Sequence, residues 1–77
     1  MDFKTRLRAA RRARGLSQKA LGAALGVTQS AVTAWETGQH EPGYKTLVPL
    51  SRLLGVSIDY LLAGADGKGE APPPDVL

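Results

Sequence analysis

Residues 17–38 read SQKALGAALGVTQSAVTAWETG. Apolar residues recur in this stretch at helical rather than strand spacing, and Gly26 and Gly38 interrupt the pattern. Glycine readily takes the positive φ that ends a helix, so we expect one helix that begins after Ser17 and ends at Gly26. A second helix begins after Thr28 and ends before Gly38. The stretch therefore predicts two helices joined by a tight turn.

Gly22 falls inside the first of these helices, where a glycine costs about 1 kcal/mol relative to alanine. A glycine at this place is explained if the backbone of another helix approaches closely, so we expect a packing site there. Leu21, Ala24 and Leu25 form the apolar face of the first helix. The apolar residues that hold the two helices together are Leu21, Leu25, Val27, Val32 and Trp35.

The outer face of the second helix carries short side chains without charge. These are Gln29, Ser30, Thr33, Ala34 and Thr37. A solvated helix face is usually rich in Lys and Glu, and this one has neither before Glu36. Short amides and hydroxyls suit a helix that enters a major groove, because they add little bulk and supply donors and acceptors for base edges. The alternative is a surface of small residues without a function.

Helical spacing continues on both sides of this pair. Before it, Phe3, Leu7 and Ala10 mark one face of a helix, with Asp2 as a possible N-cap and Gly15 as a left-handed C-terminal cap. After the loop of residues 38–43, two more helices are marked by Leu47, Leu50, Leu53, Leu54, Ile58, Leu61 and Leu62, with Gly55 ending one and Ser57 capping the other. We therefore predict a compact all-α domain of five short helices.

Pro49 affects where the fourth helix begins. If the helix began at Tyr44, Pro49 would remove the hydrogen bond to the Lys45 carbonyl and crowd the preceding turn. A start with Thr46 as N-cap places Pro49 in the first turn, where a missing N–H matters little. We therefore expect the later start.

The composition excludes several classes of function. A chain of 77 residues has room for one domain, and this one has no cysteine and a single histidine. It therefore lacks a disulfide framework, a thiolate metal site and a cysteine nucleophile. Its few carboxylates are dispersed, so we expect no metal, no cofactor and no enzymatic activity. No apolar run approaches the ~20 residues of a membrane span, which predicts a soluble intracellular domain.

Charge and composition divide the chain into two parts. Residues 1–63 carry nine Lys or Arg against four Asp or Glu, which suits a polyanion binder. Within them, the basic residues of segment 4–14 are explained either as a solvated helix face or as a source of salt-sensitive attraction to DNA. Residues 64–77, GADGKGEAPPPDVL, have the composition of a flexible tail or linker. A Pro-rich end also fits a hinge to a further domain, so the chain is either a whole protein or an N-terminal part.

The order and spacing of five motifs resemble a known family. They are LSQxxLG at 16–22, LGVTQS at 25–30, VTAWExG at 32–38, a loop with Pro42, and LGVSIDYLL at 54–62. Together they resemble the helix-turn-helix domain of the phage repressor/Cro class (lambda-repressor-like, XRE family), over about residues 3–63. The resemblance implies a five-helix bundle whose second and third helices form the motif, with the third as recognition helix.

The resemblance also implies roles for individual residues. The matched base-reading positions are Gln29, Ser30, Thr33 and Ala34, although Ala34 has the alternative explanation that the groove wall lies close. The matched positions near the DNA backbone are Gln18, Thr28, Thr37 and Lys45. Family members commonly pair an Arg and a Glu at the positions of Arg11 and Glu36, so we expect a structural ion pair.

The function implied is that of a cytoplasmic, nucleoid-associated regulator from a bacterium or phage. It would bind double-stranded DNA in the major groove, most simply as a repressor that dimerises on a two-fold operator. The Ile58–Leu62 helix is a candidate dimer contact, with core packing as the alternative. Two other functions fit the same domain: an antitoxin-type autoregulator that also binds a partner protein, and an interaction module that has lost DNA binding.

Overall fold

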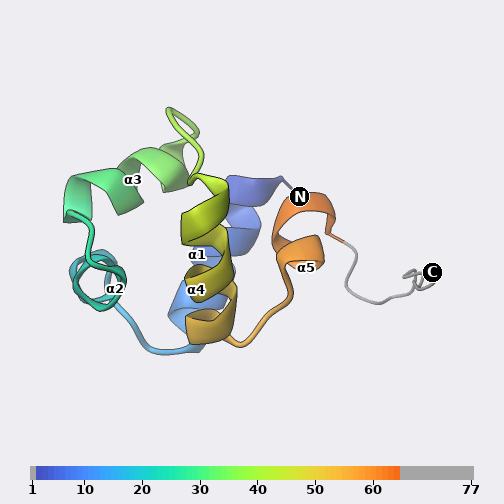
Figure 1. Ribbon diagram of the computed structural model, residues 1–77, viewed down its shortest axis with the longest axis horizontal. Coiled ribbons are helices and arrows are strands. Elements are labelled where there is room, and N and C mark those ends of the chain that lie inside the picture. The colour runs from blue at the N-terminus through green and yellow to red at the C-terminus, as the bar shows by residue number, and fades with distance from the viewer. Residues whose placement is uncertain (1, 65–77) are drawn as a thin grey trace.

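Five helices make up the computed structural model, which describes residues 2–64 (Figure 1). They are α1 (Phe3–Ala13), α2 (Gln18–Leu25), α3 (Gln29–Thr37), α4 (Tyr44–Leu54) and α5 (Ile58–Ala63), and this part of the chain contains no strand. The predicted all-α fold of five short helices is confirmed. The predicted tail, apart from Gly64, lies outside the described residues.

Four helices begin as their N-cap residues predict. The side chains of Asp2, Ser17, Thr28 and Ser57 each accept a hydrogen bond from the backbone N–H three residues later. Each bond satisfies one of the N–H groups that a helix leaves free at its start. The predicted glycines also take positive φ at the helix ends, for example 76° at Gly26, so short polar caps and glycines define these boundaries.

The start of α4 differs from the prediction. The helix begins at Tyr44 with Gly43 as N-cap, and the backbone N–H groups of Thr46 and Leu47 already donate to the Gly43 carbonyl. The predicted N-cap at Thr46 is therefore wrong, and Pro49 lies inside the helix. Pro49 and Lys45 are both exposed, so water can satisfy the Lys45 carbonyl that loses its intrahelical donor.

The core is built mainly from leucine. Its buried members come from every helix and are Leu7, Ala10, Leu21, Val32, Trp35, Leu47, Leu50, Leu54 and Leu61. Ala24, which we expected on the apolar face of α2, is exposed. Alanine is short enough to tolerate either environment, so helical spacing alone did not separate the two.

The helices lie so that α2 and α3 occupy one end of the domain (Figure 1). α1 packs against α3 and α5, and α4 packs against α2 and α5.

Arg6 of α1 is buried and donates from Nε to the Leu61 carbonyl (3.1 Å) and from Nη2 to the Leu62 carbonyl (3.2 Å). These bonds satisfy carbonyls at the end of α5 and hold that helix on the body. Within residues 2–64, no helix has the length and apolar character that crossing a membrane requires.

Candidate nucleic-acid interface

The turn between α2 and α3 sets how the second helix leaves the first. Gly26 ends α2 in the left-handed conformation, and the Val27 N–H donates to the Gly22 carbonyl (2.9 Å). A Cβ at Gly22 would lie 2.9 Å from the Val27 oxygen and 3.1 Å from the Thr28 oxygen. A close backbone approach at Gly22 is therefore present, but the approaching backbone is that of Val27 and Thr28 in the turn and not that of another helix, as we had expected.

The outward face of α3 is polar, small and uncharged. Gln29 and Ser30 are exposed in its first turn, and Thr33 and Ala34 are half-buried in the next. Gln29 therefore presents an amide, and Ser30 a hydroxyl, at the end of the helix that a groove would receive first. These groups can donate and accept hydrogen bonds at base edges.

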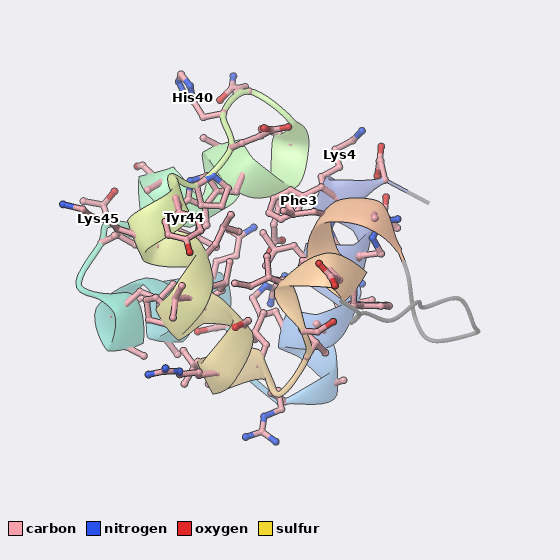
Figure 2. The ribbon with its side chains drawn as sticks, turned by 45° about the vertical axis from the view of Figure 1, so that its right-hand side comes forward. Phe3, Lys4, His40, Tyr44 and Lys45 are labelled. Carbon is pink, nitrogen blue, oxygen red and sulfur yellow. The ribbon has the colours of Figure 1, made fainter. Side chains whose placement is uncertain are left out.

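The residues expected near the DNA backbone come from α2, α3 and α4, and Gln18 is the first residue of α2. Thr28 is exposed at the start of α3, and its hydroxyl oxygen accepts from the Ala31 N–H (3.0 Å). Thr37 is exposed at the other end of α3, where its hydroxyl donates to the Ala34 carbonyl (3.2 Å). Lys45 is exposed in the first turn of α4 and points away from the body (Figure 2).

Arg11 and Glu36 meet between α1 and α3. Arg11 donates from Nε to Glu36 Oε2 (2.6 Å) and from Nη2 to Glu36 Oε1 (3.0 Å), which is a two-bond guanidinium–carboxylate pair. The Glu36 side chain is 1% exposed, and that of Arg11 is 10% exposed. Arg11 also donates from Nη1 to the Leu16 carbonyl (2.8 Å), so the ion pair joins α1, α3 and the segment before α2.

Two further side chains complete the surroundings of Glu36. Arg8 places Nε 3.6 Å from Glu36 Oε1 and donates from Nη2 to the Glu36 backbone carbonyl (3.0 Å). Gln18 donates from Nε2 to Glu36 Oε1 (3.1 Å), and its Oε1 accepts from the Thr33 hydroxyl (2.8 Å). A polar network thus runs from α1 through α3 to the first residue of α2.

This network sets the charge state of its members. Burial raises the pKa of Glu36, but hydrogen bonds from Arg11 and Gln18 and the charges of the nearby arginines more than offset it. The net result is a pKa below the ordinary value for glutamate. The hydrogen bonds to Glu36 raise the pKa of the Arg11 guanidinium. Glu36 is therefore an anion and Arg11 a cation at neutral pH.

Acid should destabilise the domain through Glu36. Because the pKa of Glu36 is lower in the folded than in the unfolded chain, the stabilisation is complete above the unfolded value, ~4.3, and is lost as the pH falls through the folded value. Urea unfolding at several pH values between 7 and 3 measures this loss. Hydrogen bonds from Lys4 and Thr5 also lower the pKa of Asp2, so Glu36→Gln should reduce the acid sensitivity without abolishing it. An unchanged pH profile in Glu36→Gln would contradict the assignment.

Sequence reasoning missed how far the basic residues of α1 point into the protein. Arg6 donates hydrogen bonds to carbonyls at the end of α5. Arg8, like Arg11, contacts Glu36. Lys4 pairs with Asp2 on the surface (2.6 Å). Arg8 lies three residues before Arg11, a spacing that shares one helix face and could have indicated a common partner. Much of this basic segment therefore serves contacts inside the domain.

His40 lies at the loop between α3 and α4 and is exposed (Figure 2). Across residues 2–64, no group of three His, Asp or Glu side chains lies close enough together to hold a metal ion.

Comparison with known proteins places this geometry in a family. A family model described as helix-turn-helix matches residues 7–61. The chain is 45% identical over 66 residues to the uncharacterized HTH-type transcriptional regulator YqaE of Bacillus subtilis (strain 168), covering 86% of this chain and 57% of YqaE. It is 42% identical over 59 residues to repressor protein C2 of Salmonella phage P22, covering 77% of this chain and 27% of that repressor.

A solved structure agrees with the sequence matches. The crystal structure of the P22 c2 repressor protein in complex with synthetic operator 9T, in the presence of Tl+, matches with a TM-score of 0.80 and 39% identity. The match covers 83% of this chain and 97% of that one. The two curated relatives are longer, and the chain spans little more than half of one and about a quarter of the other. On its residues, its five helices and these matches, the chain belongs to the helix-turn-helix family, with the XRE-type, phage-repressor-like form of that domain.

Proposed function

We propose that this chain binds double-stranded DNA sequence-specifically as part of a transcriptional regulator, a repressor of the phage or prophage type. The observation that carries the proposal is the first turn of α3. Gln29 and Ser30 are exposed there on a helix face without charge, and the buried Arg11–Glu36 pair fixes that helix to α1. A rigid helix with short donors and acceptors at its start suits base reading in the major groove. The likeness to a repressor solved with a synthetic operator supports the same function.

The contacts divide by chemistry. Gln29 can pair with adenine N6 and N7 through its amide, and Ser30 can donate to or accept from a neighbouring base. Ala34 is small and half-buried, which suits contact with a thymine methyl group. Lys45, Thr28 and the end of α3 then lie against phosphates, which position the protein without carrying sequence information.

The proposal includes a homodimer on a two-fold operator. On α5, Leu61 is fully buried in the core, while Leu62 is 53% exposed. Ile58 and Tyr60 are half-buried on the same helix. Of the two explanations for this helix, core packing therefore fits Leu61 and a partner contact fits Leu62.

Gln29→Ala should remove discrimination at one base pair of each half-site. Loss of a two-bond amide–adenine contact is expected to weaken binding to the preferred sequence by about 1–3 kcal/mol per half-site, with a smaller effect on sequences altered at that pair. Titration of labelled duplexes that carry each base pair in turn measures the change. Gln39→Ala is the matched control, because Gln39 is exposed in the loop after α3. It should leave the base preference unchanged.

Selection from random duplex DNA at near-physiological salt tests the function as a whole. Enrichment of inverted half-sites about one helical turn apart would establish a dimeric sequence-specific binder. Retention of DNA without an enriched sequence, abolished by modest added salt, would contradict the proposal and leave electrostatic attraction alone.

A further inference from the structure

Arg6 is buried on α1, and its guanidinium contacts the last turn of α5. We propose that Arg6 is a positioning residue: by holding that turn, it fixes the orientation of the proposed dimer contact and so sets the spacing of half-sites that a pair of protomers accepts. The inference rests on the proposed function, because it requires that α5 meet a second copy of the chain on a two-fold operator.

The last turn of α5 is closed by one local group and one distant group. The Gly64 N–H donates to the Tyr60 carbonyl (2.9 Å) within the turn itself. The next two carbonyls, those of Leu61 and Leu62, accept from Nε and Nη2 of Arg6. A helix leaves its last four carbonyls without intrahelical donors, and a cation beside them also interacts favourably with the helix dipole. Arg6 therefore completes the hydrogen bonding of this turn from another helix.

α5 depends on such contacts because it is short. It has six residues, whereas isolated helices below about 12–15 residues are marginal in water. Its buried side chain is Leu61, and the candidate partner contact, Leu62, is exposed at the next position. The two carbonyls that accept from Arg6 belong to these two residues. Arg6 thus holds the backbone at the point where one side chain enters the core and the next one faces outward.

α1 connects this contact to the base-reading helix. On the same helix, Arg11 pairs with Glu36 of α3, and Arg8 donates to the Glu36 backbone carbonyl. α1 packs against both α3 and α5, which lie toward opposite ends of the domain (Figure 1). Arginines of α1 therefore hold the base-reading helix on one side and the proposed dimer helix on the other. The separation of the two α3 helices in a dimer follows from how both are held.

Arg6→Met removes the guanidinium and keeps an unbranched apolar side chain. α4 also packs against α5, so the helix should stay attached but take several orientations. Binding to a single half-site should stay within about twofold of the unaltered chain, whereas binding to two half-sites should weaken about tenfold, because both protomers must place α5 correctly. Titrations of duplexes with one and with two half-sites, at the same salt concentration, measure the two effects.

The spacing preference gives a readout that a merely structural role would not change. One base pair added between the half-sites moves them apart by about 3.4 Å and rotates one by about 34°. The unaltered chain should bind this longer operator poorly, since α5 is held in one orientation. Arg6→Met should reduce that penalty at least about threefold. Arg6→Lys, which can still donate to a carbonyl, should restore part of the preference.

Gly64→Ala disturbs the same contact from the other helix. A Cβ at Gly64 would lie 2.9 Å from Arg6 Nη1 and 3.3 Å from Arg6 Cζ, so the guanidinium must shift. Gly55→Ala is the matched control, because Gly55 ends α4 with a φ of 71°, close to the 73° of Gly64. Apart from its chain neighbours, a Cβ there would approach residues 2–64 no closer than 3.8 Å, at Arg14 Nη1. Both variants strain the backbone, but only Gly64→Ala should relax the spacing preference. An unchanged preference in both Arg6→Met and Gly64→Ala would overturn the inference.

Amide hydrogen exchange in the free protein keeps the inference separate from the proposed function. The N–H groups of Leu61 and Gly64 donate within α5 and should exchange at least about tenfold faster in Arg6→Met, while those of α3 keep their rates. Leu62→Ser, which removes the partner contact alone, should leave the exchange in α5 unchanged. If the unaltered chain selects no paired half-sites, the two-fold operator fails and the spacing role with it, while the exchange rates still decide whether Arg6 holds α5. Unchanged exchange in Arg6→Met would overturn the positioning even where paired half-sites are selected.

Discussion

Arg11→Met should lower the free energy of unfolding by about 3 kcal/mol, because it leaves the buried Glu36 carboxylate without its two-bond partner. Removing one member of a buried pair usually costs about 3–5 kcal/mol. We expect the lower end of that range, since Arg8 and Gln18 still face Glu36. A domain of this size has a total stability of only about 3–10 kcal/mol, so the loss would be a large part of it.

Urea unfolding followed by circular dichroism at neutral pH measures this effect. Arg12→Met is the matched control, because Arg12 is the next residue on α1 and is exposed. Its change should stay within about 0.5 kcal/mol, as for most surface substitutions. A loss in Arg11→Met as small as that of the control would contradict a stabilising role for the ion pair.

The double variant Arg11→Met with Glu36→Leu separates stability from DNA binding. Buried ion pairs can often be replaced by apolar side chains without net loss, so this variant should regain much of the stability that Arg11→Met loses. It should still bind the operator more weakly than the unaltered chain. Without the carboxylate, the Gln18 amide nitrogen loses the acceptor on α3 to which it donates, and only the bond from Thr33 still holds the amide.

The helix boundaries were the most predictable part of the fold. Ser17, Thr28 and Ser57 each cap the helix that follows them, and Gly26 and Gly55 end helices with positive φ. These signals are local, because each depends on one side chain and its own backbone. The fold class and the helix pair could therefore be predicted from the sequence.

The start of α4 could not be predicted from the local effect of Pro49 on helix hydrogen bonding. A start at Tyr44 costs α4 one intrahelical hydrogen bond, yet the helix begins there and keeps Pro49 inside. Whether the Lys45 carbonyl can reach water depends on which side of α4 faces the core. The buried Leu47 and Leu50 settle that, and their packing is a tertiary property.

The polar network was only partly predictable. The Arg11–Glu36 contact was expected from the family resemblance, and the structure places the two side chains together. The partners of Arg6 and the bond from Thr33 to Gln18 were missed, since they join residues 55 and 15 positions apart, respectively. Helical spacing tells which residues share a face. It does not tell which polar atom on another helix that face will meet.

Gly22→Ala should destabilise the domain and weaken DNA binding, although alanine is the better helix former. A Cβ at this position would lie 2.9–3.2 Å from backbone atoms of Val27 and Thr28, which cannot rotate away as a flexible side chain would. Overpacking of this kind costs about 1–3 kcal/mol, while the gain in helix propensity is about 1 kcal/mol. We therefore expect a net loss of up to about 2 kcal/mol.

The effect on DNA should exceed what the lost stability explains. To admit the methyl group, α2 must move away from the turn, and the turn carries the Thr28 cap of α3. Gln29 and Ser30 then shift relative to Gln18, which sits on the other helix. Since base reading depends on contacts aligned to a fraction of an ångström, we expect at least about a tenfold loss of operator affinity, or about 1.4 kcal/mol, even where the variant is fully folded.

Two variants on the same helix and turn isolate this mechanism. Ala23→Gly lies on the exposed face of α2 and should lose about 1 kcal/mol of stability through helix propensity alone. A Cβ at Gly26 would meet no atom within 4 Å among residues 2–64 other than its chain neighbours, so Gly26→Ala should lose about 1–2 kcal/mol of stability through the strained φ of 76°. Both should bind the operator nearly normally under folded conditions, because neither pushes α2 away from α3. If Gly22→Ala binds the operator as tightly as these two variants do, the close approach at Gly22 contributes to stability only and does not set the position of α3.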